Sequence, residues 1–391
     1  MFEYFKKDNK PRNIVNERGA SISRQPPASS LPVQMMLNPK FTSVSVAKPK
    51  RGKTAQTFFL TDARGHKFVM KFDNGHPSNA PRESFASNFI ENIGRGNLTA
   101  PESKVLHKRS REIVDLKKIL ATDYTPEGRE LYLLLFSFSN PYIILQEFSE
   151  GSMLEYSKKP QSPYREFEQD SRRGIQMGRL AAYDLFLGNW DRLWYSFNEG
   201  NMLVSGSSYN ISTIDQTLSF GDMDHLANKV LGLGKEEDML GSRMTPEGER
   251  ESIFTMTDVD EQELTCKANQ IAEKCLRAFK KIIEEFMSPG TEAPSALEGL
   301  HFTIYSSIVI DPLALTIGFV EGCFDIAMHS RLSSALMDQA NHEQFLAEAS
   351  AFHMMWQKFP PVLDSFPHIE IKRKLDEYKA ALGLTASYSD K

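Results

Sequence analysis

The sequence predicts an α+β protein of two lobes, and three observations support this prediction. Segments with strand patterns gather in the first third of the chain, around a single helical segment. After Gly151 the hydrophobic residues recur with helical spacing. A short strand-like insert interrupts this helical part. We therefore expect a strand-rich lobe at residues 41–150 and a mainly helical lobe with C-terminal helices at 151–391. Residues 1–40 are polar, contain a Pro-Pro pair and show no sustained period, which predicts a flexible extension.

The first lobe can be divided by local patterns. Residues 41–46 and 67–72 alternate apolar and polar side chains, and residues 57–60 are aromatic and β-branched, which indicates strands. A helix is expected at 81–93, because proline suits a first turn and Gly94 suits a helix end. Further strands are expected at residues 103–107, 131–138 and 142–148.

The rest of the chain is mostly helical in pattern. A long helical pattern covers residues 167–187, and in residues 261–287 apolar side chains recur at steps of three, four and seven. Short strands are expected at 201–204 and 212–214, whereas residues 234–262 are polar, contain glycine and proline, and predict a long loop. Strands with one helix, followed by helices around a short β insert, are the layout of a protein-kinase-like fold.

Composition narrows the class of protein. Of the 391 residues, 40% are hydrophobic and 25% are charged, as in soluble globular proteins. The net charge of -5 argues against a general nucleic-acid binder, which would be basic. Three cysteines are too few, and odd in number, for a disulfide framework, so we expect reduced thiols and a cytoplasmic protein.

The N-terminus lacks the apolar core of a secretory signal. The most apolar window, 302–320, is broken by Asp311 and Pro312, so no transmembrane segment is expected.

The strand predicted at 67–72 presents a candidate nucleotide-contacting face. Side chains alternate along a strand, so Val69 and Lys71 share the face opposite to the larger apolar residues. A kinase site needs a small apolar residue against the adenine and, two residues later, a lysine that reaches the phosphates. Taken alone, this strand favours the simpler interpretation of Lys71 as a surface lysine on a half-exposed strand.

The helix predicted at 81–93 carries a candidate partner for Lys71. Glu83 lies on the same helical stripe as Ala86 and Ile90. An acid on a core-facing stripe needs a positive partner, since burying an unpaired charge is costly. We therefore expect Glu83 to pair with Lys71, the alternative being a glutamate at the exposed edge of the helix.

The strongest chemical signal lies in YDLFLGNWDRLWYSFNEGNMLV, which YNISTIDQTLSF follows. Asp191 comes after a helix, Asn201 opens an apolar strand, and Asp215 closes another. Phosphoryl transfer on this fold needs one carboxylate to accept a hydroxyl proton, and an amide oxygen and a second carboxylate to hold magnesium. Hard oxygen ligands suit this metal. Taken singly, each of these residues could be a turn former or a helix terminator.

The loop around Asp191 is longer than in ordinary protein kinases, since Asn201 lies ten positions after Asp191. Asn198 is therefore a rival to Asn201 as the metal ligand. We predict that Arg192 belongs to the catalytic residues and holds the loop through its guanidinium. A lysine at this position is expected to be partly tolerated.

These motifs resemble the catalytic domain of actin-fragmin kinase. They are also similar to the phosphoinositide 3- and 4-kinases, whose signatures hold an Asp-Arg pair, a downstream Asn and an Ile-Asp-x-x-x-x-Phe element. The resemblance covers residues 41–290 and implies ATP and Mg²⁺ as cofactors. As site residues it implies the catalytic base Asp191, the metal ligands Asn201 and Asp215, the phosphate-contacting Lys71 and its partner Glu83.

The segment YIILQEF resembles the hinge strand that binds adenine through its backbone. This resemblance implies that Gln146, Glu147 and Phe148 contact the nucleotide, in addition to Val69 and Lys71.

Departures from ordinary protein kinases bear on the phosphate acceptor. Gln216 and Thr217 stand where Phe-Gly would follow the metal-binding aspartate, and no Ala-Pro-Glu element closes an activation segment. Residues 216–225 contain no Lys or Arg and hold Asp222 and Asp224, so they would repel an anionic lipid headgroup. We expect a Ser/Thr protein kinase whose candidate substrate is actin or an actin complex. A phosphoinositide kinase is the alternative.

Two further classes of function are open, a pseudokinase and a P-loop NTPase. A pseudokinase that serves as an interaction module would have no physical need for the complete Lys-Asp-Asn-Asp set. The segment AKPKRGKT formally fits a relaxed phosphate-loop pattern through Ala47, Gly52, Lys53 and Thr54. A true phosphate loop opens a helix, whereas the following TFFLTD predicts a strand, which favours a basic hairpin tip. The nine histidines form no zinc-binding motif.

Overall fold

The computed structural model divides into two units, Met1–Met36 and Leu37–Lys391. In the first unit, β1 (Ile14–Val15) pairs antiparallel with β2 (Ser21–Ile22), and the rest of the extension expected at residues 1–40 lies outside the described residues. The described residues are 14–15, 21–22, 41–51, 55–94, 98–153, 171–195, 197–204, 211–233, 239–244, 250–256, 259–290, 293–305, 309–329 and 346–384.

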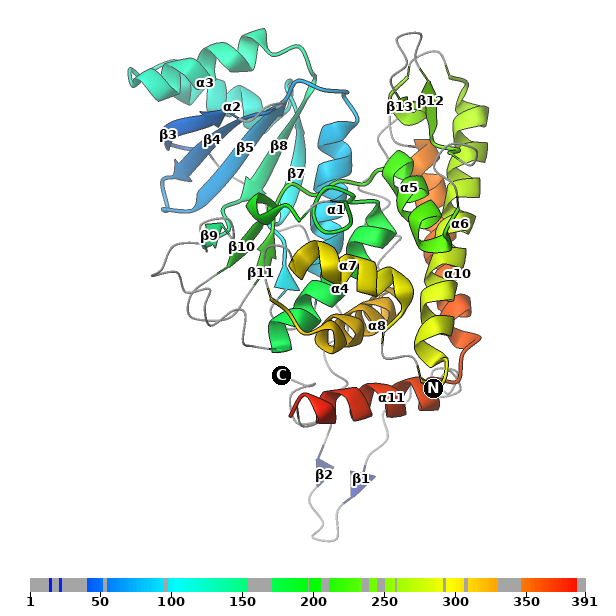
Figure 1. The fold of residues 1–391 in the computed structure, drawn as a ribbon. Helices are drawn as coiled ribbons and strands as arrows, with labels where there is room; N and C mark the ends of the chain where they lie inside the picture. The colour runs from blue at the N-terminus through cyan, green and yellow to red at the C-terminus, as the bar shows by residue number, and fades with distance from the viewer. Residues whose placement is uncertain are drawn as a thin grey trace. The chain divides into compact units, whose positions relative to one another are not determined.

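A five-stranded antiparallel sheet forms the strand-rich lobe, in the order β3-β4-β5-β8-β7 (Figure 1). The strands predicted in this region are present, apart from the one at 131–138. Their bounds are β3 (Val44–Arg51), β4 (Ala55–Asp62), β5 (Lys67–Asp73), β7 (Ser103–His107) and β8 (Tyr142–Glu147).

The two faces of this sheet have different surroundings. Phe58, Met70 and Phe72 are buried on one face, in a hydrophobic core that they share with α2 (Arg111–Leu120) and α3 (Pro126–Ser137). Val69 and Lys71 alternate with these residues along β5 and so lie on the opposite face. The predicted alternation is confirmed, and it leaves Lys71 on the face that α2 and α3 do not cover.

The prediction of a strand at 131–138 was wrong, because these residues belong to helix α3. Thr125 caps the helix by accepting a hydrogen bond from the Gly128 amide, and Pro126 occupies the first turn. Leu131 and Leu135, one turn apart, are its deeply buried residues. The run LYLLLF is apolar on every side, so its pattern alone does not separate a strand from a helix.

Helix α1 (Asn79–Ile93) matches the helix expected at 81–93 and joins the sheet to the helical lobe. The ring of Phe89 stacks on Phe186 of α4 (Ser171–Leu187), with centroids 5.6 Å apart. It also meets Trp356 of α10 (Leu346–Asp364) edge to face, at 5.2 Å. These contacts fix α1, and with it Glu83, against the helical lobe.

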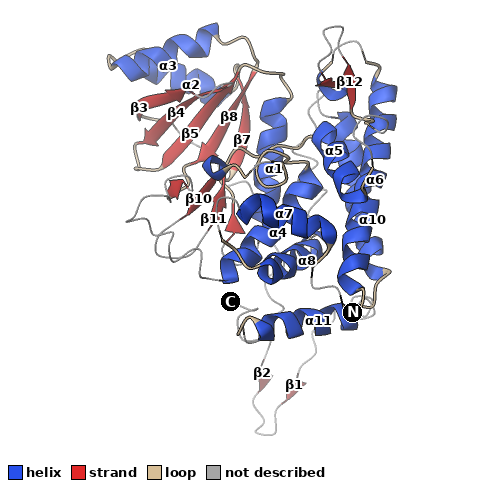
Figure 2. Ribbon diagram, viewed as in Figure 1, coloured by secondary structure: helices blue, strands red, loops and turns tan. Residues whose placement is uncertain are grey.

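The second lobe is mainly helical and also holds a small sheet, of which β10 and β11 are labelled in Figure 2. Its sheet has the order β6-β11-β10-β9, in which β10 and β11 form the short insert expected from the sequence. The strands are β6 (Leu98–Thr99), β9 (Ser152–Met153), β10 (Met202–Val204) and β11 (Ile211–Thr213), and the other helices are α5 (Phe220–Leu231), α6 (Glu261–Met287), α7 (Ser295–Tyr305), α8 (Pro312–Met328) and α11 (His368–Ala381).

Helices α4 and α8 approach each other closely enough for their backbones to touch. A Cβ atom at Gly178 would overlap the carbonyl oxygen of Leu315, and one at Gly318 would overlap the backbone of Ile175. Only glycine fits at these two positions. Helix α4 ends at Leu187, directly before the loop that carries Asp191, so this packing fixes the base of that loop.

The loop expected at 234–262 contains more structure than its composition predicts. In its described part, β12 (Ser242–Met244) and β13 (Arg250–Ser252) form an antiparallel pair, and a short 3-10 helix, η5 (Ile253–Thr255), follows. The apolar window 302–320 falls on α7 and α8. Within the described ranges, no helix is both long and apolar enough to cross a membrane.

The fold is therefore α+β and bilobal, of the protein-kinase-like kind. A five-stranded antiparallel sheet with α1 packed beside it precedes a helical lobe, and the β10–β11 hairpin is inserted into that lobe after α4.

Candidate functional site

Lys71 contacts two carboxylates, one on α1 of its own lobe and one in the helical lobe. Its Nζ lies 2.6 Å from Oε1 of Glu83 and also contacts Oδ1 of Asp215. Lys71 and Glu83 are each 9% exposed, so the pair expected from the sequence is present and buried. Burial alone would lower the pKa of Lys71, but the charges of Glu83 and Asp215 outweigh it and raise the pKa. The ammonium is therefore charged.

Asp215 differs from the other two members of this group because its side chain is 53% exposed. Its backbone has a φ of 52°, the left-handed region that non-glycine residues seldom enter. Such a conformation is unfavourable by about 1–3 kcal/mol and is typical of functional sites. The carboxylate thus touches Lys71 on one side and is open to solvent on the other.

Asn201 is placed beside Asp215 by the β10–β11 hairpin. Met202 pairs with Thr213, and the amide of Ile214 donates to the carbonyl of Asn201 at 3.0 Å. Asn201 is 9% exposed and ends a short 3-10 helix, η4 (Glu199–Asn201). Asn201 comes directly before β10, and Asp215 comes shortly after β11. The two predicted metal ligands therefore lie at the same end of the hairpin.

Asn198 is occupied by other contacts. Its Oδ1 accepts a hydrogen bond from the amide of Gly200, and its Nδ2 donates to Oδ2 of Asp191 at 3.1 Å. Asp191 itself is exposed. Asn198 therefore orients Asp191 and has its amide oxygen engaged, whereas no such bond engages the side chain of Asn201 among the described residues.

Arg192 is fully buried, and its guanidinium faces away from solvent. Its Nη2 and Nε donate to Asp184 at 2.6 and 3.0 Å, and Nη2 also donates to Oε1 of Gln216 at 2.5 Å. Burial raises the pKa of Asp184 to about 6, against the opposing charge of Arg192. Because Arg192 cannot reach a substrate, it holds the loop. Its planar guanidinium donates two hydrogen bonds to one carboxylate, a bidentate arrangement that lysine cannot make.

Sequence reasoning missed Asp184 and Gln216. An available signal for Asp184 was its place as the one charged residue in the apolar run LAAYDLFL. A charge at such a position needs a buried partner. The only signal for Gln216 was its departure from the Phe-Gly of ordinary kinases.

The predicted hinge residues lie in a different setting from the expected one. Gln146 pairs with Val69 in the sheet, and its Nε2 donates to Oε1 of Glu83 at 3.3 Å. The backbone amide of Glu147 donates to the backbone carbonyl of Glu102, and the amide of Phe148 donates to the carbonyl of Lys67. Because these two backbone N–H groups already have acceptors, they do not offer adenine a donor in this arrangement.

The phosphate-loop reading is contradicted by the element that follows it. Gly52, Lys53 and Thr54 lie outside the described residues, but the next residues form strand β4, which pairs along its length with β5. A phosphate loop presents its amides at the start of a helix. A strand in that place provides no such helix.

Donor chemistry decides which cation would suit this site. Among the residues that the structure describes, no three His, Cys, Asp or Glu side chains gather around one point. Asp215 and Asn201 offer one carboxylate and one amide oxygen. Magnesium commonly binds through one or two protein oxygens together with substrate phosphates and water, so these two residues fit magnesium carried by a nucleotide.

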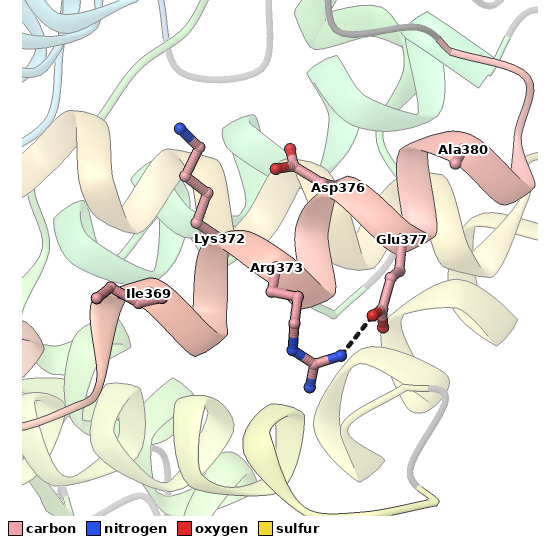
Figure 3. A pocket seen from close by; sticks show the side chains of 6 residues that line it. All are labelled: Ile369, Lys372, Arg373, Asp376, Glu377 and Ala380. Atoms are coloured by element: carbon pink, nitrogen blue, oxygen red, sulfur yellow. Dashed lines mark hydrogen bonds and ion pairs between the residues drawn. The ribbon is translucent and has the colours of Figure 1, made fainter.

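A surface hollow elsewhere in the molecule carries none of the predicted site residues. It follows the exposed side of α11, and Arg373 and Glu377 form an ion pair along it (Figure 3). All of its lining residues belong to this one helix: Ile369, Lys372, Arg373, Asp376, Glu377 and Ala380.

Comparison with known proteins gave matches among solved structures alone. No family model and no curated protein sequence matches the chain. A MAP kinase from Leishmania major is 9% identical, with 81% of this chain and 94% of that chain covered and a TM-score of 0.26. The Rio2 kinase of Chaetomium thermophilum, solved as an ADP/Mg²⁺-phosphoaspartate complex, is 11% identical, with coverage of 81% and 72% and a TM-score of 0.27. An aminoglycoside phosphotransferase from Alicyclobacillus acidocaldarius is 9% identical, with coverage of 82% and 93% and a TM-score of 0.20. Scores this low carry no argument, so the fold assignment rests on the arrangement of strands and helices described above.

Proposed function

We propose that this protein is an ATP- and magnesium-dependent phosphotransferase, and that it is a Ser/Thr protein kinase like actin-fragmin kinase. One observation carries the proposal. Lys71 contacts both Glu83 of α1 and Asp215 of the β10–β11 region, so a phosphate-binding cation and a metal-binding carboxylate from the two lobes face each other.

In this proposal each residue has a separate task. Lys71, held by Glu83, contacts the nucleotide phosphates, while Asp215 and Asn201 hold magnesium. Bound magnesium neutralises charge on the phosphates. Val69 packs against the adenine from the same sheet face as Lys71. Backbone contacts to the adenine come from the residues after Phe148, since the amides up to that point are already engaged.

Asp191 is proposed as the general base. It is exposed, and Asn198 holds one of its carboxylate oxygens. As the acceptor hydroxyl oxygen bonds to the γ-phosphorus, the bond from that phosphorus to the leaving oxygen of ADP breaks, and Asp191 takes the hydroxyl proton. Water is kept from part of the site because Lys71 and Glu83 are buried.

A protein hydroxyl is the proposed acceptor, with actin or an actin complex as the candidate, in a cytoplasmic setting. Burial and, to a smaller extent, the nearby charge of Asp191 raise the pKa of Asp222, so one further carboxylate, that of Asp222, lies near the candidate base. An anionic lipid headgroup would be repelled there. Asp224 does not contribute as expected, because it is buried and paired with Lys274 at 2.5 Å.

Phosphate transfer from radiolabelled Mg-ATP tests the proposal directly. Wild type is incubated with actin, with generic protein substrates and with phosphatidylinositol vesicles, next to Asp215→Ala and the control Asp376→Ala, which alters an exposed acid on α11. We expect label on protein hydroxyls with wild type and the control, and none with Asp215→Ala. Label on phosphatidylinositol alone would make the protein a lipid kinase, and label on nothing would contradict the proposal.

A further inference from the structure

We propose that Asp184, Arg192 and Gln216, here called the clamp, position Asp215 for magnesium. Asp184 and Gln216 would then be positioning residues that act on the metal without touching it. The inference rests on the proposed function only in taking Asp215 as the metal ligand.

The clamp joins three parts of the chain that surround the site. Asp184 lies in the last turn of α4, Arg192 follows the candidate base, and Gln216 follows Asp215 directly. Arg192 and Asp184 are fully buried and Gln216 is 3% exposed, so no ligand can reach them. Their three hydrogen bonds, of 2.5 to 3.0 Å, all converge on the guanidinium of Arg192.

Asp215 needs fixed points on both sides to keep its left-handed backbone. On one side, Ile214 is bonded through its amide to the carbonyl of Asn201. On the other side, Gln216 is bonded through its side chain to Arg192. An unfavourable backbone conformation persists only where its surroundings enforce it. Release of Gln216 would therefore let Asp215 relax and turn its carboxylate away from the position that Lys71 now marks.

Gln216 is the member that allows a clean test. Replacing it removes one acceptor from Arg192 but leaves the buried pair between Arg192 and Asp184 intact. The Nε2 atom of Gln216 has no hydrogen-bond partner among the described residues, so only its oxygen holds the clamp. Gln216→Met should break the clamp, and Gln216→Glu, which keeps oxygen acceptors at the same reach, should restore it.

The experiment is calorimetric titration with a non-hydrolysable ATP analogue, once with magnesium and once with EDTA, on variants shown by circular dichroism to be folded. Gln176→Met is the matched control, since Gln176 is a buried glutamine of α4 that does not belong to the clamp. We expect Gln216→Met to weaken binding of the magnesium complex about tenfold, the range typical of lost supporting contacts around a metal. Metal-free binding should not change, and Gln216→Glu should recover most of the loss.

Three results would overturn the clamp. They are unchanged magnesium-dependent binding in Gln216→Met, equal losses with and without magnesium, and a loss in the Gln176→Met control as large as that in Gln216→Met. Failure of the proposed function looks different, because wild type would then bind the magnesium complex but phosphorylate no acceptor. A wild-type protein whose nucleotide binding ignores magnesium would overturn both proposals.

Discussion

Two of the buried cations, Lys71 and Arg192, lie at the candidate site, and they differ in what surrounds them. Lys71 contacts two carboxylates, one of which, on Asp215, is half open to solvent. Arg192 also holds two side chains, but every member of its group is enclosed. A group with one open member can exchange a contact for a ligand, whereas an enclosed group can only hold its neighbours in place. Substitutions in the first group should therefore act directly on binding and turnover. Substitutions in the second group should act on stability and, through Gln216, on the position of Asp215.

Asp215→Ala should have the largest effect, because it removes the open member of the Lys71 group. We expect phosphate transfer and magnesium-dependent nucleotide binding to be lost, since the carboxylate is the main charged ligand offered to the metal. The melting temperature should stay near that of wild type. Calorimetry showing wild-type affinity for Mg-ATP in the folded variant would remove Asp215 from the metal site.

Asp191→Asn should lower turnover while leaving nucleotide binding nearly unchanged. A general base contributes about 10²–10⁴-fold in rate, and asparagine keeps the shape but cannot take the proton. We propose measuring kcat, Mg-ATP affinity and Tm on a single preparation. If Asp191 is only a turn residue, the variant will instead melt earlier with full turnover per folded molecule.

Arg192→Lys should act on stability. Lysine cannot donate the two parallel hydrogen bonds that Arg192 makes to Asp184 and would leave a buried carboxylate poorly paired. We expect a loss of about 3–5 kcal/mol in the free energy of unfolding. This expectation replaces the partial tolerance inferred from the sequence. Chemical denaturation measures it, and a loss under about 1 kcal/mol would show that the enclosed group is not as rigid as its contacts indicate.

Asp184 should make stability depend on pH. Burial raises its pKa in the folded state from 3.8 to about 6, so between these pH values the folded protein binds a proton more tightly than the unfolded chain. The contribution of this group to the free energy of unfolding is therefore full below pH 4 and is lost as the pH rises through about 6, by about 3 kcal/mol in total. Asp184→Asn, compared with wild type by denaturation from pH 4 to 7, should remove this slope. Parallel curves for the two proteins would contradict the assignment.

The coupling between Lys71 and Glu83 should be the smallest and most specific effect, and Lys71→Met and Glu83→Gln together measure it. Their losses in kcat/KM should fall short of additivity by about 0.5–3 kcal/mol in a double-mutant cycle, because each change removes the same ion pair. Additive losses would mean that the contact has no functional weight. Lys53→Met serves as the control from the rejected phosphate-loop reading and should be far less harmful than Lys71→Met.

Local patterns predicted what depends on local chemistry. Strand alternation placed Lys71 on the face opposite the core. Helical spacing made Glu83 a candidate partner for Lys71 but left an exposed glutamate as the alternative, and the contact between the two side chains decides between them. The same rules failed for α3, where a continuous apolar run has no period to read, and its capping Thr125 outweighed the strand-like composition. Gln216 and the engaged hinge amides could not be predicted, because their partners are set by tertiary packing.

The backbone contact between α4 and α8 limits which amino-acid substitutions the site can tolerate. Gly178 and Gly318 leave no gap to absorb even one added methyl group, so a larger side chain at either position must push the two helices apart. Since α4 runs directly into the loop of Asp191, that displacement would be passed on as a rigid-body shift of the loop. Residues that take no part in any chemical step are thereby restricted in size as tightly as those that do.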